Sequence, residues 1–356
     1  MGAAKLPLFF QDKPLLGLDI GTGSVKVMQV DLSRKKPTVK GYGTASFDPS
    51  CIENGVIVNP EPIAAAIKKL IDKGVIGTLS TKRVALSVPA SHTYARELFL
   101  PHLPTKELPE AIHTEAEQYI PRNLDELYLD YTINEKTDSE LHVYTVAAPK
   151  NIVDSYVDIA YILGLEPVSV TSSLDATTRL LTAQRKKTEP CVIIDFGTKS
   201  ADISIFNDYI TVTGTVQAGG DLFTEKIMKH LNVTEHEAIA LKTKYGVAVS
   251  NNQVDIRTAV APLLQQIVRE VKRMLRYYAD RSGENDTITH VITMGGGANM
   301  PGLNTYLAEQ LKLPTDMLDP WQVLDYGKLQ PPNITERTIY LTVAGLALTQ
   351  PKEVFA

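Results

Sequence analysis

Two short segments hold the residues of this chain whose types and spacing could bind an anion. The first, residues 18–24, reads Leu-Asp-Ile-Gly-Thr-Gly-Ser and follows an apolar stretch. Alternation of apolar residues predicts a hairpin over 15–31, with the glycines at its turn. Glycine lets backbone N–H groups approach a phosphate closely, and hydroxyl groups donate to phosphate oxygen atoms. The predicted phosphate ligands of this hairpin are Gly21, Thr22, Gly23, Ser24 and Lys26.

The second segment repeats the first. Residues 194–200 read Ile-Asp-Phe-Gly-Thr-Lys-Ser, and Asp195 follows Asp19 by 176 positions. A structural turn would explain one such hairpin, but a second copy in the same strand context predicts two similar domains that face one nucleotide. Mg²⁺ takes few protein carboxylates and keeps much of its water, so we expect Asp19 and Asp195 to converge on one Mg²⁺. The predicted phosphate ligands here are Gly197, Thr198, Lys199 and Ser200.

Three further elements could complete a nucleotide site. A predicted strand over 289–294 enters a run of glycines before a helix, an arrangement that binds anions at the helix start. Another glycine pair precedes a helical run through residue 231, and a lysine on the next helix could reach a ribose or a base. Tight turns and a surface lysine are the alternatives. The predicted ligands in these elements are Gly219, Gly220, Lys242, Gly295, Gly296 and Gly297.

One residue is a candidate for orienting water in ATP hydrolysis, a step that needs such a group. It is Asp175, near the start of a helix predicted to run to about residue 183, and a helix cap is the alternative role. The seven histidines show no spacing for a zinc site, and no Ser-His-Asp or Cys-His arrangement can be argued. We therefore expect slow or no hydrolysis.

Composition narrows the class of protein. The chain has 356 residues, of which 44% are hydrophobic and 22% charged, as is ordinary for a globular protein of two or three domains. A net charge of −5 gives no reason to expect a nucleic-acid partner. Cys51 and Cys191 lack metal or disulfide spacing, and no apolar run approaches the about 20 residues that span a bilayer. We expect a cytoplasmic protein.

The pattern of predicted elements divides the chain into four parts. Prolines and acidic residues become frequent after about residue 90, which indicates a small α/β insert. The fold class is α/β. The predicted parts are a first core domain of residues 1–90 with 165–188, an inserted subdomain of 91–164, a second core domain of 189–218 with 285–356, and a mainly helical subdomain of 219–284.

The two hairpins, the run Gly295–Ala298 and a small-residue helix over 342–348 together resemble the actin-like ATPase superfamily over nearly the whole chain. The resemblance implies an actin-like ATPase fold, with two duplicated RNase-H-like domains and ATP with Mg²⁺ between them. It also implies that the glycine run belongs to an adenosine motif. A subdomain inserted after about residue 90 is similar to the FtsA-like branch of the superfamily.

Within this superfamily the chain resembles the PilM family of type IV pilus assembly proteins. The residues that carry the resemblance read Gly-Leu-Asp-Ile-Gly-Thr-Gly-Ser-Val-Lys from 17, Glu-Ala-Glu-Gln-Tyr-Ile-Pro from 115 and Gly-Gly-Asp-Leu-Phe-Thr from 219. The stretch from 115 best distinguishes this family from other actin-like proteins. It lies in the insert, where nucleotide binding places few constraints on the sequence. The resemblance implies an ATP-binding scaffold that receives the N-terminal cytoplasmic tail of the membrane protein PilN in a groove between the first core domain and the insert.

The same resemblance implies a link from PilN to the pilus motor and a position at the inner membrane through partners. Self-association is left open. Two alternative functions remain open. One is an FtsA-like cell-division protein that forms filaments on the membrane, a role that requires an amphipathic anchor. The other is a small-molecule kinase of the same superfamily, which requires a carboxylate at a substrate hydroxyl.

Overall fold

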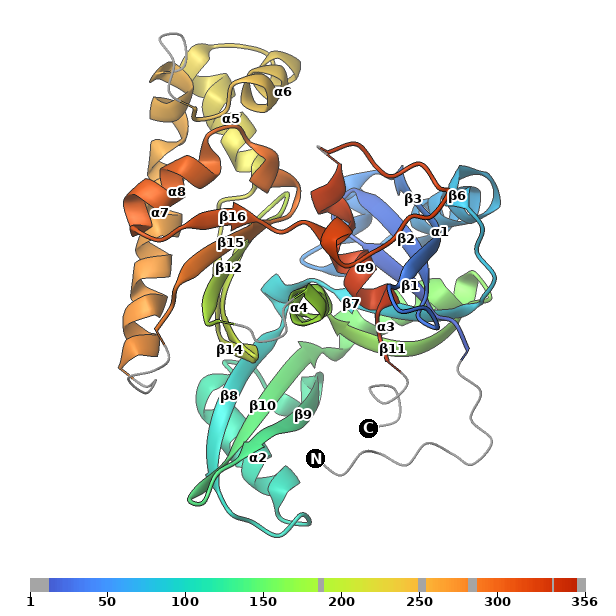
Figure 1. The fold of residues 1–356 in the computed structure, drawn as a ribbon, viewed down its shortest axis with the longest axis vertical. Coiled ribbons are helices and arrows are strands. Elements are labelled where there is room, and N and C mark those ends of the chain that lie inside the picture. The colour runs from blue at the N-terminus through green and yellow to red at the C-terminus, as the bar shows by residue number, and fades with distance from the viewer. Residues whose placement is uncertain (1–12, 185–188, 249–253, 281–286, 335, 351–356) are drawn as a thin grey trace. The chain divides into compact units, whose positions relative to one another are not determined.

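The chain folds around two main sheets, each in its own unit (Figure 1). The computed structural model describes residues 13–184, 189–248, 254–280, 287–334 and 336–350. Among these, the first unit takes its residues from 1–186, 320–332 and 340–356. The second unit takes its residues from 187–319 and 333–339.

The first unit is built on a six-stranded sheet in the order β11-β7-β1-β2-β3-β6. Strands β1, β2 and β3 form an antiparallel meander, β7 joins β1 in parallel, and β11 joins β7 in parallel. The hairpin predicted over 15–31 is confirmed. The strands are β1 (Leu16–Ile20), β2 (Ser24–Asp31), β3 (Thr38–Ser46), β6 (Ile76–Gly77), β7 (Arg83–Val88) and β11 (Glu166–Ser172), with a small hairpin of β4 (Ile52–Glu53) and β5 (Val56–Ile57).

Helices pack against this sheet because each carries an apolar stripe at helical spacing. Ile63 and Ile67 of one helix and Tyr156 of another are fully buried in one core with Leu18 and Leu86 of the sheet. A third helix meets the sheet through a smaller cluster that includes Ala176 and Leu346. The helices of this unit outside the insert are α1 (Pro60–Lys69), α3 (Lys150–Ile162), α4 (Ser173–Gln184) and α9 (Leu341–Ala347), with short turns η1 (Pro49–Cys51), η2 (Leu70–Gly74), η3 (Ala90–His92) and η6 (Pro320–Gln322).

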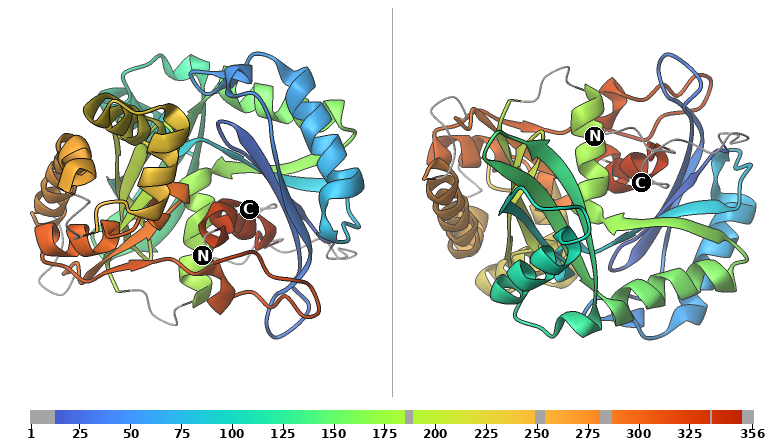
Figure 2. Two further views of the ribbon diagram at one scale, coloured as in Figure 1. Left: turned by 90° about the horizontal axis from the view of Figure 1, so that it is seen from above. Right: turned by 90° about the horizontal axis from the view of Figure 1, so that it is seen from below.

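Helices α4 and α9 lie side by side in both views of Figure 2. A Cβ atom added at Gly345 of α9 would stand 1.8 Å from the carbonyl oxygen of Ala176 in α4. One added at Gly17 of β1 would stand 2.5 Å from the carbonyl oxygen of Val343. Glycine at both positions therefore allows backbone to pack directly on backbone.

Two details of the packing differ from the predicted four-part division, which otherwise stays a prediction. Helix α9 packs on β1, β2 and β7 of the first unit, although we assigned 285–356 to the second core domain. Helix α3 shares the core of the first sheet, although we assigned 91–164 to the insert. Local periodicity predicts that a helix forms, but it does not identify the sheet that covers its apolar face.

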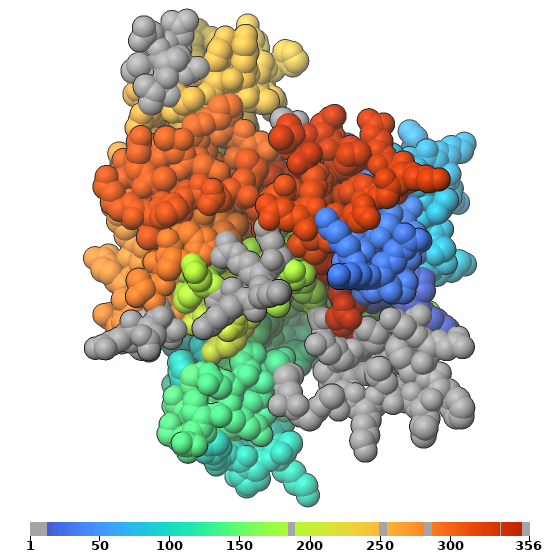
Figure 3. Space-filling view, in the orientation of Figure 1, coloured from blue at the N-terminus to red at the C-terminus, as the bar shows by residue number. Residues whose placement is uncertain are grey.

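The insert, as the name is used from here on, is residues 94–149. Its three-stranded antiparallel sheet has the order β8-β10-β9. One helix covers one face of this sheet, where Leu108 and Ile112 are buried with Leu98, Leu141 and Val143. The atoms of the insert, green in Figure 3, are uncovered on the face shown there. Its elements are β8 (Tyr94–Pro101), α2 (Leu108–Tyr119), η4 (Leu124–Glu126), β9 (Leu127–Lys136) and β10 (Glu140–Pro149).

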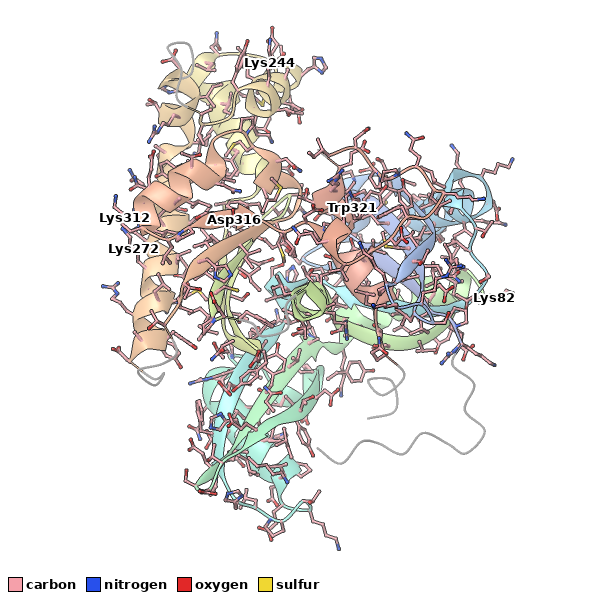
Figure 4. The ribbon with its side chains drawn as sticks, in the orientation of Figure 1. Lys82, Lys244, Lys272, Lys312, Asp316 and Trp321 are labelled. Carbon is pink, nitrogen blue, oxygen red and sulfur yellow. The ribbon has the colours of Figure 1, made fainter. Side chains whose placement is uncertain are left out.

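The second unit repeats the topology of the first around a five-stranded sheet in the order β14-β13-β12-β15-β16. An antiparallel meander again begins the unit, and β15 joins β12 in parallel as β7 joins β1. Lys272 and Lys312 project from its helices away from the sheet (Figure 4). Its elements are β12 (Cys191–Phe196), β13 (Ala201–Asn207), β14 (Tyr209–Val216), α5 (Gly220–Leu231), α6 (Glu235–Lys244), α7 (Val254–Ala279), β15 (His290–Met294), η5 (Gly296–Asn299), α8 (Leu303–Leu311), β16 (Thr315–Met317) and the start of η7 (Arg337–Tyr340).

Among the helices of the described residues, none has the length and apolar character needed to cross a membrane.

Replacing Gly345 by Ala should lower the free energy of unfolding by about 2 kcal/mol or more, since overpacking of close contacts commonly costs 1–3 kcal/mol. The new Cβ would collide with backbone atoms of Ala176, which cannot rotate away as a side chain can. Chemical denaturation followed by circular dichroism would measure the change. Gly296→Ala is the control, because its Cβ would come no closer than 3.8 Å to Ile339, and an equal loss in both variants would contradict the interpretation.

Candidate functional site

The first hairpin turn, residues 21–24, is closed by one backbone hydrogen bond. The N–H of Gly21 donates to the carbonyl oxygen of Ser24 over 2.9 Å. The strands on both sides place Asp19 directly opposite Lys26. The N–H of Phe47 donates to the carbonyl oxygen of Gly23 over 3.1 Å, which fixes the tip of the turn from the end of β3. The predicted ligands Gly21, Thr22, Gly23, Ser24 and Lys26 therefore lie together.

Asp19 is held by polar groups from two neighbouring strands. The hydroxyl of Ser87 on β7 donates to its Oδ1 over 2.9 Å, and the Nζ of Lys26 on β2 lies 3.6 Å from its Oδ2. Both Ser87 and Lys26 are buried. We did not predict Ser87, although a serine inside the apolar run Val-Ala-Leu-Ser-Val of β7 is a signal that could have found it.

The second hairpin turn, residues 197–200, has the same geometry. The N–H of Gly197 donates to the carbonyl oxygen of Ser200 over 2.9 Å, as Gly21 does to Ser24 in the first turn. The residue opposite Asp195 is Asp202, however, where the first hairpin has a lysine. The two hairpins thus share a backbone design and differ in charge.

Asp202 is a residue that we did not predict. Desolvation raises its pKa from 3.8 to about 6, although the hydroxyls of Thr215 and Ser200 donate to it. The Thr215 hydroxyl lies 2.7 Å from its Oδ1. The repeat offset that relates Asp19 to Asp195 also relates Lys26 to Asp202, so the sequence did contain the signal.

The start of α5 packs against the second hairpin turn. The N–H groups of Gly219, Gly220 and Asp221 donate to the carbonyl oxygens of Lys199, Gly197 and Thr198 over 3.2, 3.0 and 3.0 Å. A Cβ at Gly219 would stand 2.3 Å from the carbonyl oxygen of Thr198, so only glycine fits there. Because C=O and N–H of a trans peptide point in opposite directions, the N–H groups of residues 198–200 point away from α5.

Lys242 lies beside this helix start and is engaged by protein atoms. Its Nζ donates to the carbonyl oxygen of Gly220 over 2.7 Å and lies 2.6 Å from the hydroxyl of Thr224. Desolvation lowers the pKa of Lys242, and the charge of Asp221 acts against that shift. The lysine therefore connects α6 to the first turn of α5, and its predicted role at a ribose or base stays a prediction.

The glycine run after β15 lies against the strand that carries Asp195. Gly295 has φ +80°, and a Cβ there would stand 2.2 Å from Oδ1 of Asp195. A Cβ at Gly297 would stand 2.8 Å from Cβ of Phe196. The absence of side chains at these positions leaves room for the carboxylate of Asp195, and Gly296 continues the turn into η5.

Asp175 lies in the first turn of α4, where it is partly buried. The hydroxyl of Tyr144 donates to its Oδ1 over 2.7 Å, and the hydroxyl of Ser172 donates to its Oδ2 over 2.5 Å. The N–H of Asp175 donates back to the Ser172 hydroxyl over 3.0 Å, which caps the helix. Desolvation raises the pKa of Asp175, while the two hydroxyls and Arg179 oppose the shift. These contacts suit a structural acceptor, and the role in orienting water stays a prediction.

The predicted site residues thus form two sets. Asp19 and the first turn belong to the first unit, and Asp195, the second turn, the start of α5, Lys242 and the glycine run belong to the second. Within the described residues, no group of three or more His, Cys, Asp or Glu side chains could hold a metal ion by itself.

Replacing Asp202 by Asn should favour the folded state increasingly as the pH rises. The folded-state pKa of Asp202 is raised, so its contribution to stability is complete below its ordinary value of 3.8 and is lost as the pH passes about 6. The difference in free energy of unfolding between variant and parent should change by up to about 3 kcal/mol over this range. Urea denaturation at a series of pH values would measure it.

Asp31→Asn is the matched control of opposite sign. A hydrogen bond from Ser33 and the neighbouring Lys40 lower the pKa of Asp31 to about 2. Its contribution is therefore present above its ordinary value and is lost as the pH falls through about 2. The Asp31 variant should lose stability relative to the parent as the pH rises, and the same trend in the Asp202 variant would contradict the assignment.

Comparison with known proteins supports the predicted fold. A solved structure described as the PilM-PilN type IV pilus biogenesis complex superposes with a TM-score of 0.80 at 22% identity, covering 94% of this chain and 97% of that chain. MreB5 of Spiroplasma citri bound to ADP superposes with a TM-score of 0.54 at 13% identity, covering 94% of both chains. The predicted actin-like ATPase fold is confirmed.

Sequence comparison gives the family. The cell division protein FtsA of Enterococcus faecalis is 24% identical over 329 residues, which cover 81% of this chain and 74% of the relative. FtsA of Streptococcus pneumoniae is 21% identical over 337 residues, which cover 81% of this chain and 71% of the relative. The model of the family described as type IV pilus assembly protein PilM matches residues 17–351. The chain therefore belongs to the PilM family of type IV pilus assembly proteins.

Proposed function

We propose that this protein is a nucleotide-responsive scaffold of the type IV pilus assembly complex, which binds ATP with Mg²⁺ and holds the N-terminal cytoplasmic tail of PilN. The second hairpin turn carries the nucleotide part of the proposal. Three successive carbonyl groups of this turn accept hydrogen bonds from the start of α5, so the three N–H groups of residues 198–200 point the opposite way. Successive N–H groups in a turn form a concave anion site that suits a phosphate.

The first hairpin turn supplies the matching half. It has the same closing hydrogen bond, the same preceding aspartate, and a buried lysine whose charge complements a phosphate. Actin-like proteins bind their nucleotide with two such hairpins, and a relative with this fold was solved with ADP. Gly21 to Ser24 with Lys26, and Gly197 to Ser200, are the phosphate ligands of the proposal. Gly219, Gly220, Lys242 and Gly295 to Gly297 complete the nucleotide-binding residues.

The chemistry of the donor set fits Mg²⁺ bound together with a nucleotide. Mg²⁺ usually binds through one or two carboxylates plus substrate phosphates and water. Asp19 and Asp195 occupy the same position before the two turns, and neither belongs to a dense ligand cluster within the described residues. Asp19 and Asp195 would hold the ion, which would neutralise phosphate charge.

We expect hydrolysis to be slow or absent without partners. Asp175 is the only candidate for orienting water, and both of its carboxylate oxygens accept hydrogen bonds from protein hydroxyls. An engaged, desolvated carboxylate is a poor base for water, because it has few acceptor sites left to offer.

Asp19→Asn and Asp195→Asn should each weaken binding of a fluorescent ATP analogue at least tenfold when Mg²⁺ is present, because each removes a carboxylate ligand. The effect should shrink in EDTA, where no divalent ion links nucleotide and protein. Equilibrium fluorescence titration would measure both affinities. Asp31→Asn is the control, since Asp31 lies at the other end of β2 from the first turn. Unchanged affinity in both site variants would contradict the assignment of Asp19 and Asp195 as Mg²⁺ ligands.

The charge of the insert supports the proposed partner. Residues 94–149 contain eleven acidic and four basic side chains, so the insert is more negative than the whole chain with its net charge of −5. Cytoplasmic segments next to membrane spans carry an excess of Lys and Arg. A basic tail therefore complements the insert, and through PilN the protein would lie at the cytoplasmic side of the inner membrane and reach the pilus motor.

A synthetic peptide with the N-terminal tail of PilN from the same organism should bind with micromolar or tighter affinity, which isothermal titration calorimetry would measure. The affinity should fall by about tenfold or more between 50 and 500 mM salt, because opposite charges outside a dry interface are screened. A peptide of the same composition in scrambled order is the control. Absence of binding to the folded protein would refute the partner assignment.

An FtsA-like filament protein is the second candidate, favoured by the FtsA relatives. The same peptide titration separates the two candidates, because that role does not require a PilN tail.

A further inference from the structure

The insert contacts the rest of the first unit at α3, where the hydroxyl of Tyr128 donates to Asp154 over 3.0 Å, and at the first turn of α4. The hydroxyl of Tyr144, on the middle strand of the insert, donates to Oδ1 of Asp175 over 2.7 Å. The N–H of Ala90, just before the insert begins, donates to the hydroxyl of Ser173 over 3.1 Å. One helix turn therefore contacts the chain both where it enters the insert and on the strand by which it returns.

Tyr144 and Asp175 share a hydrogen bond and also affect each other's pKa. Desolvation raises the pKa of both groups. The Asp175 carboxylate raises the pKa of Tyr144 further, and the hydrogen bond from Tyr144 lowers the pKa of Asp175, as expected when a phenol donates to a carboxylate. The second oxygen of Asp175 is occupied by Ser172, over 2.5 Å. Hydrogen bonds to a carboxylate that is partly removed from water are stronger than neutral ones.

Helix α4 also stands at a chain connection between the two units. It ends at Gln184, and the next described strand, β12 of the second unit, begins at Cys191. Its neighbour α9 begins directly after η7, which comes from the segment 333–339 of the second unit. The pair is tightly packed, because the backbone of Gly345 touches that of Ala176. Helices α4 and α9 thus form one packed pair within the first unit.

We propose that the hydrogen bond between Tyr144 and Asp175 couples the insert to α4, so that nucleotide binding between the hairpins changes the affinity of the insert for its partner tail. The inference rests on the proposed function and names its regulation. Tyr144 and Asp175 act as positioning residues, since neither needs to touch nucleotide or partner. Coupling of this kind requires an element whose arrangement both ligands bias, and α4 with the insert attached to it is that element.

The insert contains a matched control. The hydroxyl of Tyr119 lies 2.8 Å from the hydroxyl of Thr145, on the strand that carries Tyr144. Both partners of that hydrogen bond belong to the insert, so Tyr119→Phe removes a tyrosine hydroxyl without cutting the connection to α4. Tyr144→Phe removes a tyrosine hydroxyl and does cut it.

The experiment measures the affinity of the full-length protein for the PilN tail peptide by calorimetry, with and without a non-hydrolysable ATP analogue and Mg²⁺. In the parent and in Tyr119→Phe, the nucleotide should change the peptide affinity at least fivefold, the lower end of typical allosteric coupling. In Tyr144→Phe the change should fall below twofold, while the affinity without nucleotide stays within about twofold of the parent. A general loss of folding would instead lower the affinity in both conditions.

Removal of Tyr144 leaves a buried carboxylate with one donor fewer, which could unfold the variant. Tyr144→Phe combined with Asp175→Asn removes the charge as well, and it should show the same loss of coupling. Full coupling in either variant would overturn the inference, as would a parent protein that binds both ligands without mutual effect. That last result would leave the proposed function standing, whereas failure to bind the peptide or the nucleotide would refute the proposed function and the inference together.

Discussion

One backbone hydrogen bond organises the candidate site, and it occurs twice. It joins the N–H of a glycine to the carbonyl oxygen of a serine three residues later, between Gly21 and Ser24 and again between Gly197 and Ser200. The bond closes a tight turn, so that β1 ends at Ile20 and β12 at Phe196, each one residue after its aspartate. Two neighbouring elements contact the aspartates that precede these turns. The parallel strand β7 brings Ser87 to the first aspartate, and the glycine run after β15 makes room for the second.

The two turns are built alike but are not electrically alike. Opposite Asp19 the first hairpin has Lys26, which stays close to the carboxylate in a buried ion pair. Opposite Asp195 the second has Asp202, whose raised pKa reflects the cost of keeping a second carboxylate partly out of water. A duplicated fold has thus acquired one half suited to phosphate charge and one half richer in carboxylates. The proposed binding of a phosphate together with a divalent cation is consistent with this asymmetry, because the two charges need different neighbours.

The insert is the part of the first unit to which we assign partner binding. It carries more net negative charge than the whole chain, and it contacts the rest of the first unit at α3 and at the first turn of α4. The contacts of Asp175 therefore suggest a structural role in place of the predicted role in orienting water. Its hydrogen bonds with Tyr144 and Ser172 connect the insert to α4, which is the basis of the coupling we propose.

The sequence by itself determined the duplicated hairpins, the actin-like fold and the family, because glycine positions, strand alternation and the repeat offset are local or periodic signals. It also predicted which turn residues lie together within each unit, whereas their role as ligands stays a prediction. Only the tertiary structure showed that α9 packs on the first sheet and that the start of α5 donates hydrogen bonds to the second turn. It also placed Tyr144 in hydrogen-bond contact with Asp175, 31 positions away in the sequence. Ser87 and Asp202 differ from these, because the sequence held a signal for each that we did not use: a serine inside an apolar strand, and the repeat offset of 176 positions. The contacts of α9, α5 and Tyr144 depend on which faces of sheets and helices pack together, and the local patterns of a single sequence do not specify that packing.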